Sequence, residues 1–169
     1  MISFFRKRHY LFGTLLFFVP ISSFAYSPHN IYITTLSILS YVHWKDPTPN
    51  VCVVDNANAT TQLRNFSKQL QYNYTIGSVR LESVSKENCD AVFFTNTSPE
   101  VQQQFLLKNT NALILSFSTN NNDCEIGSAF CLFTTKNGNT SFKINLDTLS
   151  RSRVHVDPRV LLLAKNAEN

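Results

Sequence analysis

Four cysteines are the residues of this chain whose type and spacing best suit them to chemistry, and that chemistry is disulfide formation. They stand at Cys52, Cys89, Cys124 and Cys131. An even number of cysteines indicates a disulfide framework when a chain is exported. Three pairings are open, and the spacing favours a local Cys124–Cys131 bridge, which leaves Cys52–Cys89. Zinc binding is disfavoured, because the chain has no Cys-x-x-Cys and no histidine near the cysteines.

The N-terminus has the layout of a secretory signal. A basic stretch at residues 6–8 precedes an apolar run at 11–19 and a small-x-small cleavage site at 23–25. The apolar run is shorter than the roughly 20 residues that a membrane span needs, which disfavours a transmembrane anchor. We therefore expect residues 1–25 to be a signal peptide and 26–169 to form one exported domain.

The charge of the exported part disfavours a nucleic-acid partner. The whole chain has a formal net charge of +4, but three basic residues and no acidic ones belong to the expected signal peptide. The exported part would therefore carry about +1, far from the strongly basic balance typical of nucleic-acid-binding domains.

No catalytic or cofactor-binding pattern is visible in the sequence. The histidines are scattered without metal-ligand spacing, and there is no phosphate-binding loop and no pair of carboxylates in an apolar setting. Ser128 follows Gly127 as a nucleophile would, but the second glycine of a nucleophile elbow is missing. We therefore predict a binding protein that is no enzyme and has neither a metal nor a cofactor.

Helical and strand patterns alternate along the chain, which predicts an α/β fold. A final hairpin adds antiparallel strands, so we expect a single domain with a mixed central β-sheet flanked by helices. The expected helices are 30–44, one capped by Thr60, one starting at Ser98-Pro99-Glu100 and one opening at Asp157-Pro158, and the expected strands are 51–55, 75–84, 91–95 and 112–117.

The C-terminal hairpin is the most strongly marked element. Two strand-like runs, 130–135 and 140–146, face each other across a turn that contains Asn137-Gly138. Asn-Gly favours a two-residue hairpin turn in which both central residues take a positive φ. A Cys124–Cys131 bridge would staple this hairpin at its open side.

Two runs in the C-terminal third, Cys124 to Leu132 and Phe142 to Ser152, form a distinctive pattern. With this pattern, the C-terminal third closely resembles the YfiR family, and its enterobacterial form in particular. The likeness also includes the motif Ser-Tyr-x-x-Trp at 40–44 and the strands around Cys52 and Cys89. The residues that carry it are the run from Cys124 to Leu132, the run from Phe142 to Ser152, and then Val154, Val156, Pro158, Val160-Leu161 and Leu163-Ala164.

The resemblance implies a periplasmic repressor. Such a protein binds the periplasmic region of an inner-membrane GGDEF diguanylate cyclase, YfiN-like, and holds it inactive, which lowers cyclic-di-GMP and biofilm formation. The resemblance also implies an outer-membrane lipoprotein of the OmpA/Pal type, YfiB-like, that sequesters the repressor. It further implies that disulfides maintain the active protein. A homodimer is a further possibility, because the predicted sheet has edge strands and the first helix is apolar.

Five residues of the matching motif are candidate partner contacts. Phe130 lies beside the expected bridge, where the family bears an aromatic surface, although strand alternation also allows it to be a core residue. Asp147 and Arg151 are four apart, so they could contact the cyclase or simply pair with each other on a helix. Val154 could be core or interface, and we expect Leu161 to be core.

Arg153 is both the fifth candidate contact and a departure from the family pattern. The family has Arg-Ser-Gly-Val where this chain has Arg151-Ser152-Arg153-Val154. If the glycine position has a positive φ, Arg153 carries a strain of about 1 kcal/mol. If the position merely faces solvent, Arg153 adds a charge to the interface and alters the choice of partner.

A periplasmic sensor of a small molecule is the alternative function. An α/β sheet offers a cleft at its strand ends, and Tyr41, Trp44 and Tyr72 could stack on an aromatic ligand. Trp44 could equally anchor the first helix.

Overall fold

The structure of the chain, a computed structural model, describes residues 30–110 and 113–166, with side chains up to Leu162. The expected signal peptide lies outside these residues. The elements are α1 (Ile31–Leu39), β1 (Asn50–Val54), α2 (Ala57–Gln69), β2 (Thr75–Val79), the 3₁₀-helix η1 (Leu81–Lys86), β3 (Ala91–Phe94), α3 (Pro99–Lys108), β4 (Leu115–Ser118), β5 (Phe130–Thr134), β6 (Thr140–Ile144), α4 (Leu146–Ser152) and α5 (Arg159–Asn166).

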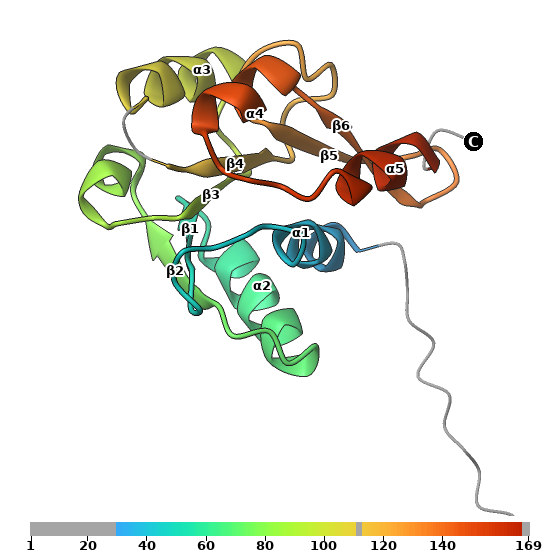
Figure 1. The fold of residues 1–169 in the computed structure, drawn as a ribbon, viewed down its shortest axis with the longest axis horizontal. Coiled ribbons are helices and arrows are strands. Elements are labelled where there is room, and N and C mark those ends of the chain that lie inside the picture. Colours follow the sequence, from blue (N-terminus) through green and yellow to red (C-terminus); the bar gives the residue numbers. More distant parts are fainter. Residues whose placement is uncertain (1–29, 111–112, 167–169) are drawn as a thin grey trace, which may run out of the picture.

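The strands form one mixed sheet, which confirms the predicted α/β fold. Their order is β2-β1-β3-β4-β5-β6; the pairs from β2 to β5 are parallel and β5–β6 is antiparallel. Figure 1 shows α1 and α2 on one face of the sheet and α3 and α4 on the other, with α5 beside β6. The strand order reverses direction between β1 and β3, as in other doubly wound sheets.

The two faces of the sheet have unequal cores. Alternate side chains of the strands, such as Phe93, Phe117 and Phe130, pack under α1 and α2 in the larger buried cluster. The cluster on the opposite face of the sheet has less than half as many buried residues as the larger cluster, counted over the described residues. Its members are Cys52, Val54, Val84, Cys89, Val92, Phe94 and Ile114.

Both predicted disulfides form, and both lie on the side of the sheet away from α1 and α2. Cys52 in β1 pairs with Cys89, and Cys124 pairs with Cys131 in β5. Cys131 points away from the larger cluster because its strand neighbours Phe130 and Leu132 belong to that cluster. The cross-links therefore reinforce the side of the sheet that has the smaller hydrophobic core.

The first helix is shorter than predicted. It starts at Asn30, whose side chain accepts a hydrogen bond from the Tyr32 amide, but it ends at Leu39 rather than near Trp44. The Trp44 indole donates a hydrogen bond of 3.0 Å to the Leu39 carbonyl oxygen. The same carbonyl oxygen also accepts from the Val42 amide at 3.2 Å, so the indole adds a second donor at the end of the helix, and Trp44 does anchor the first helix.

Two further predicted boundaries were wrong. Asn56 caps α2 by accepting from the Ala59 amide at 2.9 Å, whereas Thr60 lies within the helix and donates its hydroxyl hydrogen to the Asn56 carbonyl. The strand predicted for residues 75–84 ends at Val79, and the chain then forms η1 from Leu81. The strand ends there because β1, the strand with which it pairs, is just five residues long.

The predicted hairpin forms, but with a different turn. Only Gly138 has a positive φ (79°), and Asn137 does not. The Gly138 amide donates to the Thr135 carbonyl at 2.9 Å, and the Thr135 amide donates to the Asn139 carbonyl at 2.8 Å. This is a type I turn followed by a glycine in the left-handed region, the usual form of a three-residue hairpin loop.

Arg153 ends α4 in the left-handed conformation, with φ of 55°. The residue that departs from the family pattern therefore occupies a position that favours glycine. Asn145 begins the same helix by accepting from the Thr148 amide, and this cap ends β6 at Ile144, two residues earlier than predicted.

Replacing Arg153 with glycine is therefore expected to stabilise the protein. The gain should be about 1 kcal/mol of unfolding free energy, because glycine adopts a positive φ without steric cost. Urea unfolding of Arg153→Gly against the parent would measure it. Arg151→Gly, inside the same helix, is the control and should destabilise by about 1 kcal/mol; equal effects of the two would contradict the assignment.

Candidate partner-binding surface

The connection between β4 and β5 is a loop where a parallel pair usually has a helix. Residues 119–129, which we call the bridged loop, run between the two strands. The Cys124–Cys131 disulfide ties the middle of this loop to β5, with the two Cα atoms 5.7 Å apart. The cross-link thus fixes a segment that no regular secondary structure supports.

Gln102 of α3 fastens the bridged loop from within the protein. Its side chain is fully buried, and its amide nitrogen donates to the Thr97 carbonyl at 2.7 Å and to the Ser118 hydroxyl at 2.9 Å. Its amide oxygen accepts from the hydroxyl of Ser128 at 2.7 Å. Ser128 is itself fully buried, so its hydroxyl braces the loop and has no access to a substrate.

Further hydrogen bonds brace the bridged loop at both ends. Asn121 accepts from the Cys124 amide at 3.0 Å, and its own amide nitrogen donates to the Ile126 carbonyl at 2.7 Å. Gln103 accepts from the Gly127 amide at 2.9 Å, and Asn145 donates to the Glu125 carbonyl at 2.9 Å. The loop is therefore held rigidly between α3 and α4.

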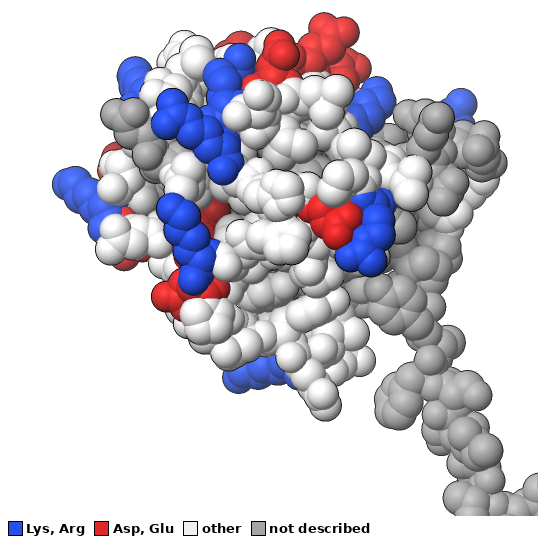
Figure 2. All heavy atoms as spheres, in the orientation of Figure 1, with Lys and Arg blue, Asp and Glu red and all other residues white. Residues whose placement is uncertain are grey.

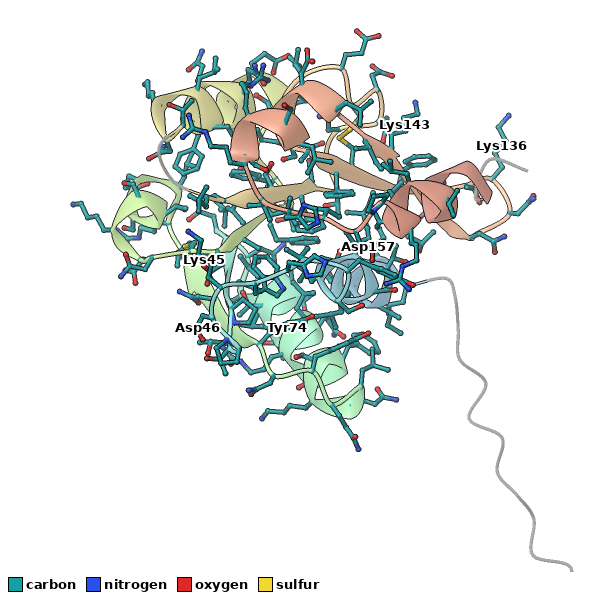
Figure 3. All side chains as sticks on the ribbon, in the orientation of Figure 1. Lys45, Asp46, Tyr74, Lys136, Lys143 and Asp157 are labelled. Carbon is teal, nitrogen blue, oxygen red and sulfur yellow. A yellow bond between two sulfur atoms is a disulfide. The ribbon has the colours of Figure 1, made fainter. Side chains whose placement is uncertain are left out.

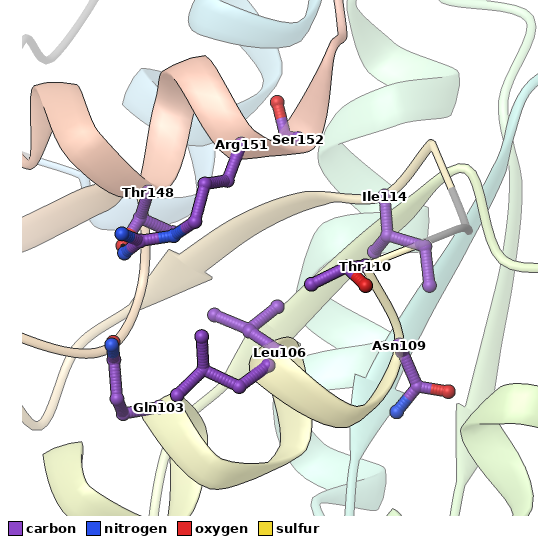
Figure 4. Close-up of a pocket in the computed structure, with 9 residues that line it drawn as sticks. Gln103, Leu106, Asn109, Thr110, Ile114, Thr148, Arg151 and Ser152 are labelled. Atoms are coloured by element: carbon purple, nitrogen blue, oxygen red, sulfur yellow. The ribbon is translucent and has the colours of Figure 1, made fainter.

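A small cleft separates α3 from α4. Figure 4 shows Arg151 running along the α4 wall of this cleft toward Thr148, with Gln103 and Leu106 on the opposite wall. The enclosed space is about 20 Å³, which is room for about one water molecule. The cleft is therefore too small for an organic ligand.

Arg151 does not form the predicted pair with Asp147. Its guanidinium donates to the Thr148 hydroxyl at 3.1 Å, and within the described residues the only ion pair joins Asp157 and Arg159. Asp147 and Arg151 are both exposed. Among the described residues neither side chain forms an ion pair, and the Arg151 guanidinium is held by the Thr148 hydroxyl.

Three exposed apolar side chains belong to α3, the bridged loop and α4. Leu107 is 49 % exposed, Ile126 43 % and Leu146 63 %. Leu107 lines the cleft, Ile126 adjoins the Gly127 amide bound by Gln103, and Leu146 starts α4. We call these three residues together with Arg151 the α3–α4 surface.

In Figure 2, acidic and basic side chains are interspersed around a largely uncharged middle, with no large patch of a single charge.

The other predicted contacts lie at different depths. Phe130 is fully buried and stacks on Phe117 at 5.2 Å, so the core alternative is the observed one for its side chain. Val154 is half-buried against the larger cluster, and Arg153 is exposed beside it. Leu161, predicted to be core, is 41 % exposed; Val160 fills that role instead.

A second hollow lies on the protein, at the amino ends of β1 and β2. It is open to solvent, measures about 490 Å³, and is lined by Trp44, Asp46, Tyr72 and Tyr74 among others; Figure 3 labels Asp46 and Tyr74. Tyr72 and Tyr74 stack at 5.3 Å, and burial raises the pKa of Tyr74 to about 12. Trp44 and Tyr72 therefore line one hollow, although at the opposite ends of the strands from the cleft that the fold class predicts, whereas Tyr41 packs under the Arg159 guanidinium outside the hollow.

Among the described residues, no group of three or more histidine, cysteine or acidic side chains is placed to hold a metal ion. No helix in the same part of the chain combines the length and apolarity needed to cross a bilayer.

Comparison with known families gives a match over most of the chain. The model of a family described as YfiR/HmsC-like matches residues 33–165. The match includes the whole sheet, both disulfides and the α3–α4 surface. It is to the family as a whole and does not resolve a subgroup.

Proposed function

This chain belongs to the YfiR/HmsC-like family, whose membership implies a periplasmic regulator of a diguanylate cyclase, and we propose that it acts as the repressor of such an enzyme. In this proposal it binds the periplasmic region of an inner-membrane, YfiN-like GGDEF protein and holds it inactive. Cyclic-di-GMP and biofilm formation fall as a result.

The observation that supports this proposal most strongly is the rigid, partly apolar α3–α4 surface. Stable interfaces have an apolar centre with charged groups toward the rim. Leu107, Ile126 and Leu146 supply exposed apolar area, and Arg151 supplies a group of the type enriched in binding hot spots. Because the disulfide and Gln102 already fix the bridged loop, little entropy is lost when a partner binds.

Repression needs no chemistry on the part of this protein. A regulator shifts a two-state enzyme only by binding one state more tightly than the other. Moving the cyclase from almost fully active to almost fully inactive takes about 5.5 kcal/mol of differential binding. A modest protein interface supplies this much.

We further propose that an outer-membrane OmpA/Pal-type lipoprotein, YfiB-like, sequesters the repressor and so releases the cyclase. Family membership supports this step, and the α3–α4 surface offers one place where the two partners would compete. A homodimer remains part of the proposal, because β2 and β6 are sheet edges without a neighbouring strand in the described chain.

Substitution at the α3–α4 surface tests the repressor function. The oxidised chain from Tyr26 onward would be immobilised and incubated with solubilised membranes of its host, and captured GGDEF proteins would be quantified by mass spectrometry. We expect Leu146→Asp to reduce capture of the cyclase tenfold or more, because about 1.4 kcal/mol is a factor of ten and a buried unpaired carboxylate costs more than that.

Leu162→Asp is the matched control, since Leu162 is as exposed (62 %) as Leu146 (63 %) but lies on α5. Equal capture by Leu146→Asp and the parent would contradict the proposed surface. Absence of any GGDEF protein from the parent sample would contradict the repressor function itself.

The Cys124–Cys131 bridge is proposed to keep the repressor active. Without it, the bridged loop loses its covalent tie to β5 and retains only its hydrogen bonds. In the same capture experiment, Cys124→Ala/Cys131→Ala should recover less cyclase than the parent. Undiminished recovery would show that binding of the cyclase does not depend on this disulfide.

A small-molecule sensor is the second candidate, favoured by the hollow that brings Trp44 and Tyr72 together. Its volume falls within the range of about 300–1,000 Å³ typical of ligand sites. A thermal-shift screen of aromatic solutes tests it, because a ligand at 100 times its dissociation constant adds about 2.7 kcal/mol of stability. Shifts that persist in Tyr72→Ala would place the ligand elsewhere.

A further inference from the structure

Two histidines that are far apart in the sequence become neighbours through a short backbone ladder. The segment after α1 and the segment between α4 and α5 form an antiparallel bridge at Val42 and Val156. The His43 amide donates to the His155 carbonyl at 3.0 Å, and the Asp157 amide donates to the Tyr41 carbonyl at 2.8 Å. The two histidine side chains thereby lie beside each other.

Their imidazole rings are close, exposed and free. The ring centroids are 4.9 Å apart, with 40° between the ring planes. Both residues are exposed, and within the described residues neither ring makes a hydrogen bond or an ion pair. Stacking of two exposed imidazoles alone contributes little, so their ring nitrogens are available to a ligand.

The charged groups next to this pair are already occupied. Asp157 accepts from the Arg159 guanidinium at 2.7 and 3.0 Å, and Arg159 in turn lies over the Tyr41 ring, 5.6 Å from its centroid. Arg159 is therefore the main partner of the Asp157 carboxylate, and His43 is close enough to interact with that carboxylate electrostatically. Any ligand of the histidine pair must be bound by ring nitrogens.

We propose that His43 and His155 together bind one divalent first-row transition-metal ion, Cu²⁺ most tightly. Imidazole nitrogen is a ligand preferred by copper, zinc and nickel, and copper leads the affinity series at a given nitrogen site. Water would complete the coordination. This site is independent of the proposed repressor function and lies apart from the α3–α4 surface.

The spacing of the rings fits such an ion. An imidazole nitrogen binds zinc at about 2.0–2.1 Å, which places the ring centroid roughly 3.2 Å from the metal. Two such rings with centroids 4.9 Å apart subtend about 100° at the ion, between the square-planar and tetrahedral angles. Because both side chains are exposed, rotation about their side-chain bonds can direct one nitrogen of each ring toward the shared ion.

A bound ion would cross-link the two segments that the antiparallel bridge pairs. It would join the end of α1 to the segment that leads into α5, where the backbone contributes only the hydrogen bonds of one bridge. An ion that binds the folded chain and not the unfolded one raises the melting temperature in proportion to the logarithm of its concentration.

Titration of the oxidised chain from Tyr26 onward with Zn²⁺, followed by calorimetry, tests the site. We expect one ion per chain, and at least a roughly tenfold loss of affinity in His43→Ala and in His155→Ala, since even outer-shell changes cost 10–100-fold. His29→Ala is the control, because His29 is the only other histidine after the expected cleavage site, and it should leave the affinity unchanged.

Paramagnetic resonance with less than one equivalent of Cu²⁺ provides the second readout, with hyperfine splitting from two imidazole nitrogens expected in the His29→Ala protein. Unchanged Zn²⁺ affinity in both single variants would overturn the proposal. So would a stoichiometry of one ion per two chains with dimer formation, because the ion would then be shared between copies rather than held within one chain.

Discussion

Replacing both Cys52 and Cys89 with alanine is expected to lower the free energy of unfolding by about 4 kcal/mol. The two residues are 37 positions apart, and a cross-link that closes a longer loop removes more entropy from the unfolded chain. Both cysteines also belong to the smaller buried cluster, which has few other residues to compensate. Because whole domains are stable by only about 5–15 kcal/mol, this variant should be close to unfolding at 37 °C.

Urea unfolding of the double variant would measure the loss. Cys124→Ala/Cys131→Ala is the matched control, since its loop spans only seven positions and should cost about 2.5 kcal/mol. A smaller loss in the Cys52/Cys89 pair than in the control pair would show that loop length does not govern the contribution of these bridges.

Gly127→Ala is expected to destabilise the protein by about 3 kcal/mol, as the sum of backbone strain and overpacking. Gly127 has a φ of 86°, and an added Cβ would lie 3.0 Å from the Gln102 amide oxygen and 3.1 Å from the Pro99 carbonyl oxygen. Neither atom can yield easily, because Pro99 belongs to the backbone of α3 and Gln102 is fixed by its hydrogen bonds.

Two other glycines separate the contributions to this loss. Gly138 has a φ of 79° with nothing within 4 Å of an added Cβ, so Gly138→Ala reports backbone strain alone, about 1 kcal/mol. Gly77 has open space and no positive φ. The expected order of destabilisation in urea is Gly127, then Gly138, then Gly77; similar losses at Gly127 and Gly138 would remove the steric argument.

The elements predicted correctly are those whose signal is local and strong. Buried strands such as 91–95 are continuous apolar runs, and the hairpin is marked by Asn137-Gly138. The errors occur where two local signals compete. Both Asn56 and Thr60 are good helix caps, and the structure uses the one that directly follows β1 and Asp55. The alternating pattern at 75–84 predicts a long strand. Its length is set by the strand with which it pairs, and β1 has only five residues to pair with it.

The candidate surface could be predicted only in part. Asp147, Arg151 and Arg153 are exposed on or next to α4. They could be predicted because a helical period and a family motif both indicate them. Gln102 could not be found, because a glutamine inside a polar helix looks like any solvated residue until the bridged loop packs against it. His43 and His155 are similarly invisible, since their proximity depends on a bridge between segments at opposite ends of the domain.

All four sulfur atoms belong to residues no more than 7 % exposed. A thiol-disulfide exchange needs a thiolate to reach a sulfur, so a finished molecule has to open before a small reductant can attack it. We therefore expect the cross-links to report the redox state of the compartment at the time when the new polypeptide folds. Chains completed earlier would keep their cross-links through a brief reducing episode, and the pool would respond to such stress at the pace of synthesis and turnover.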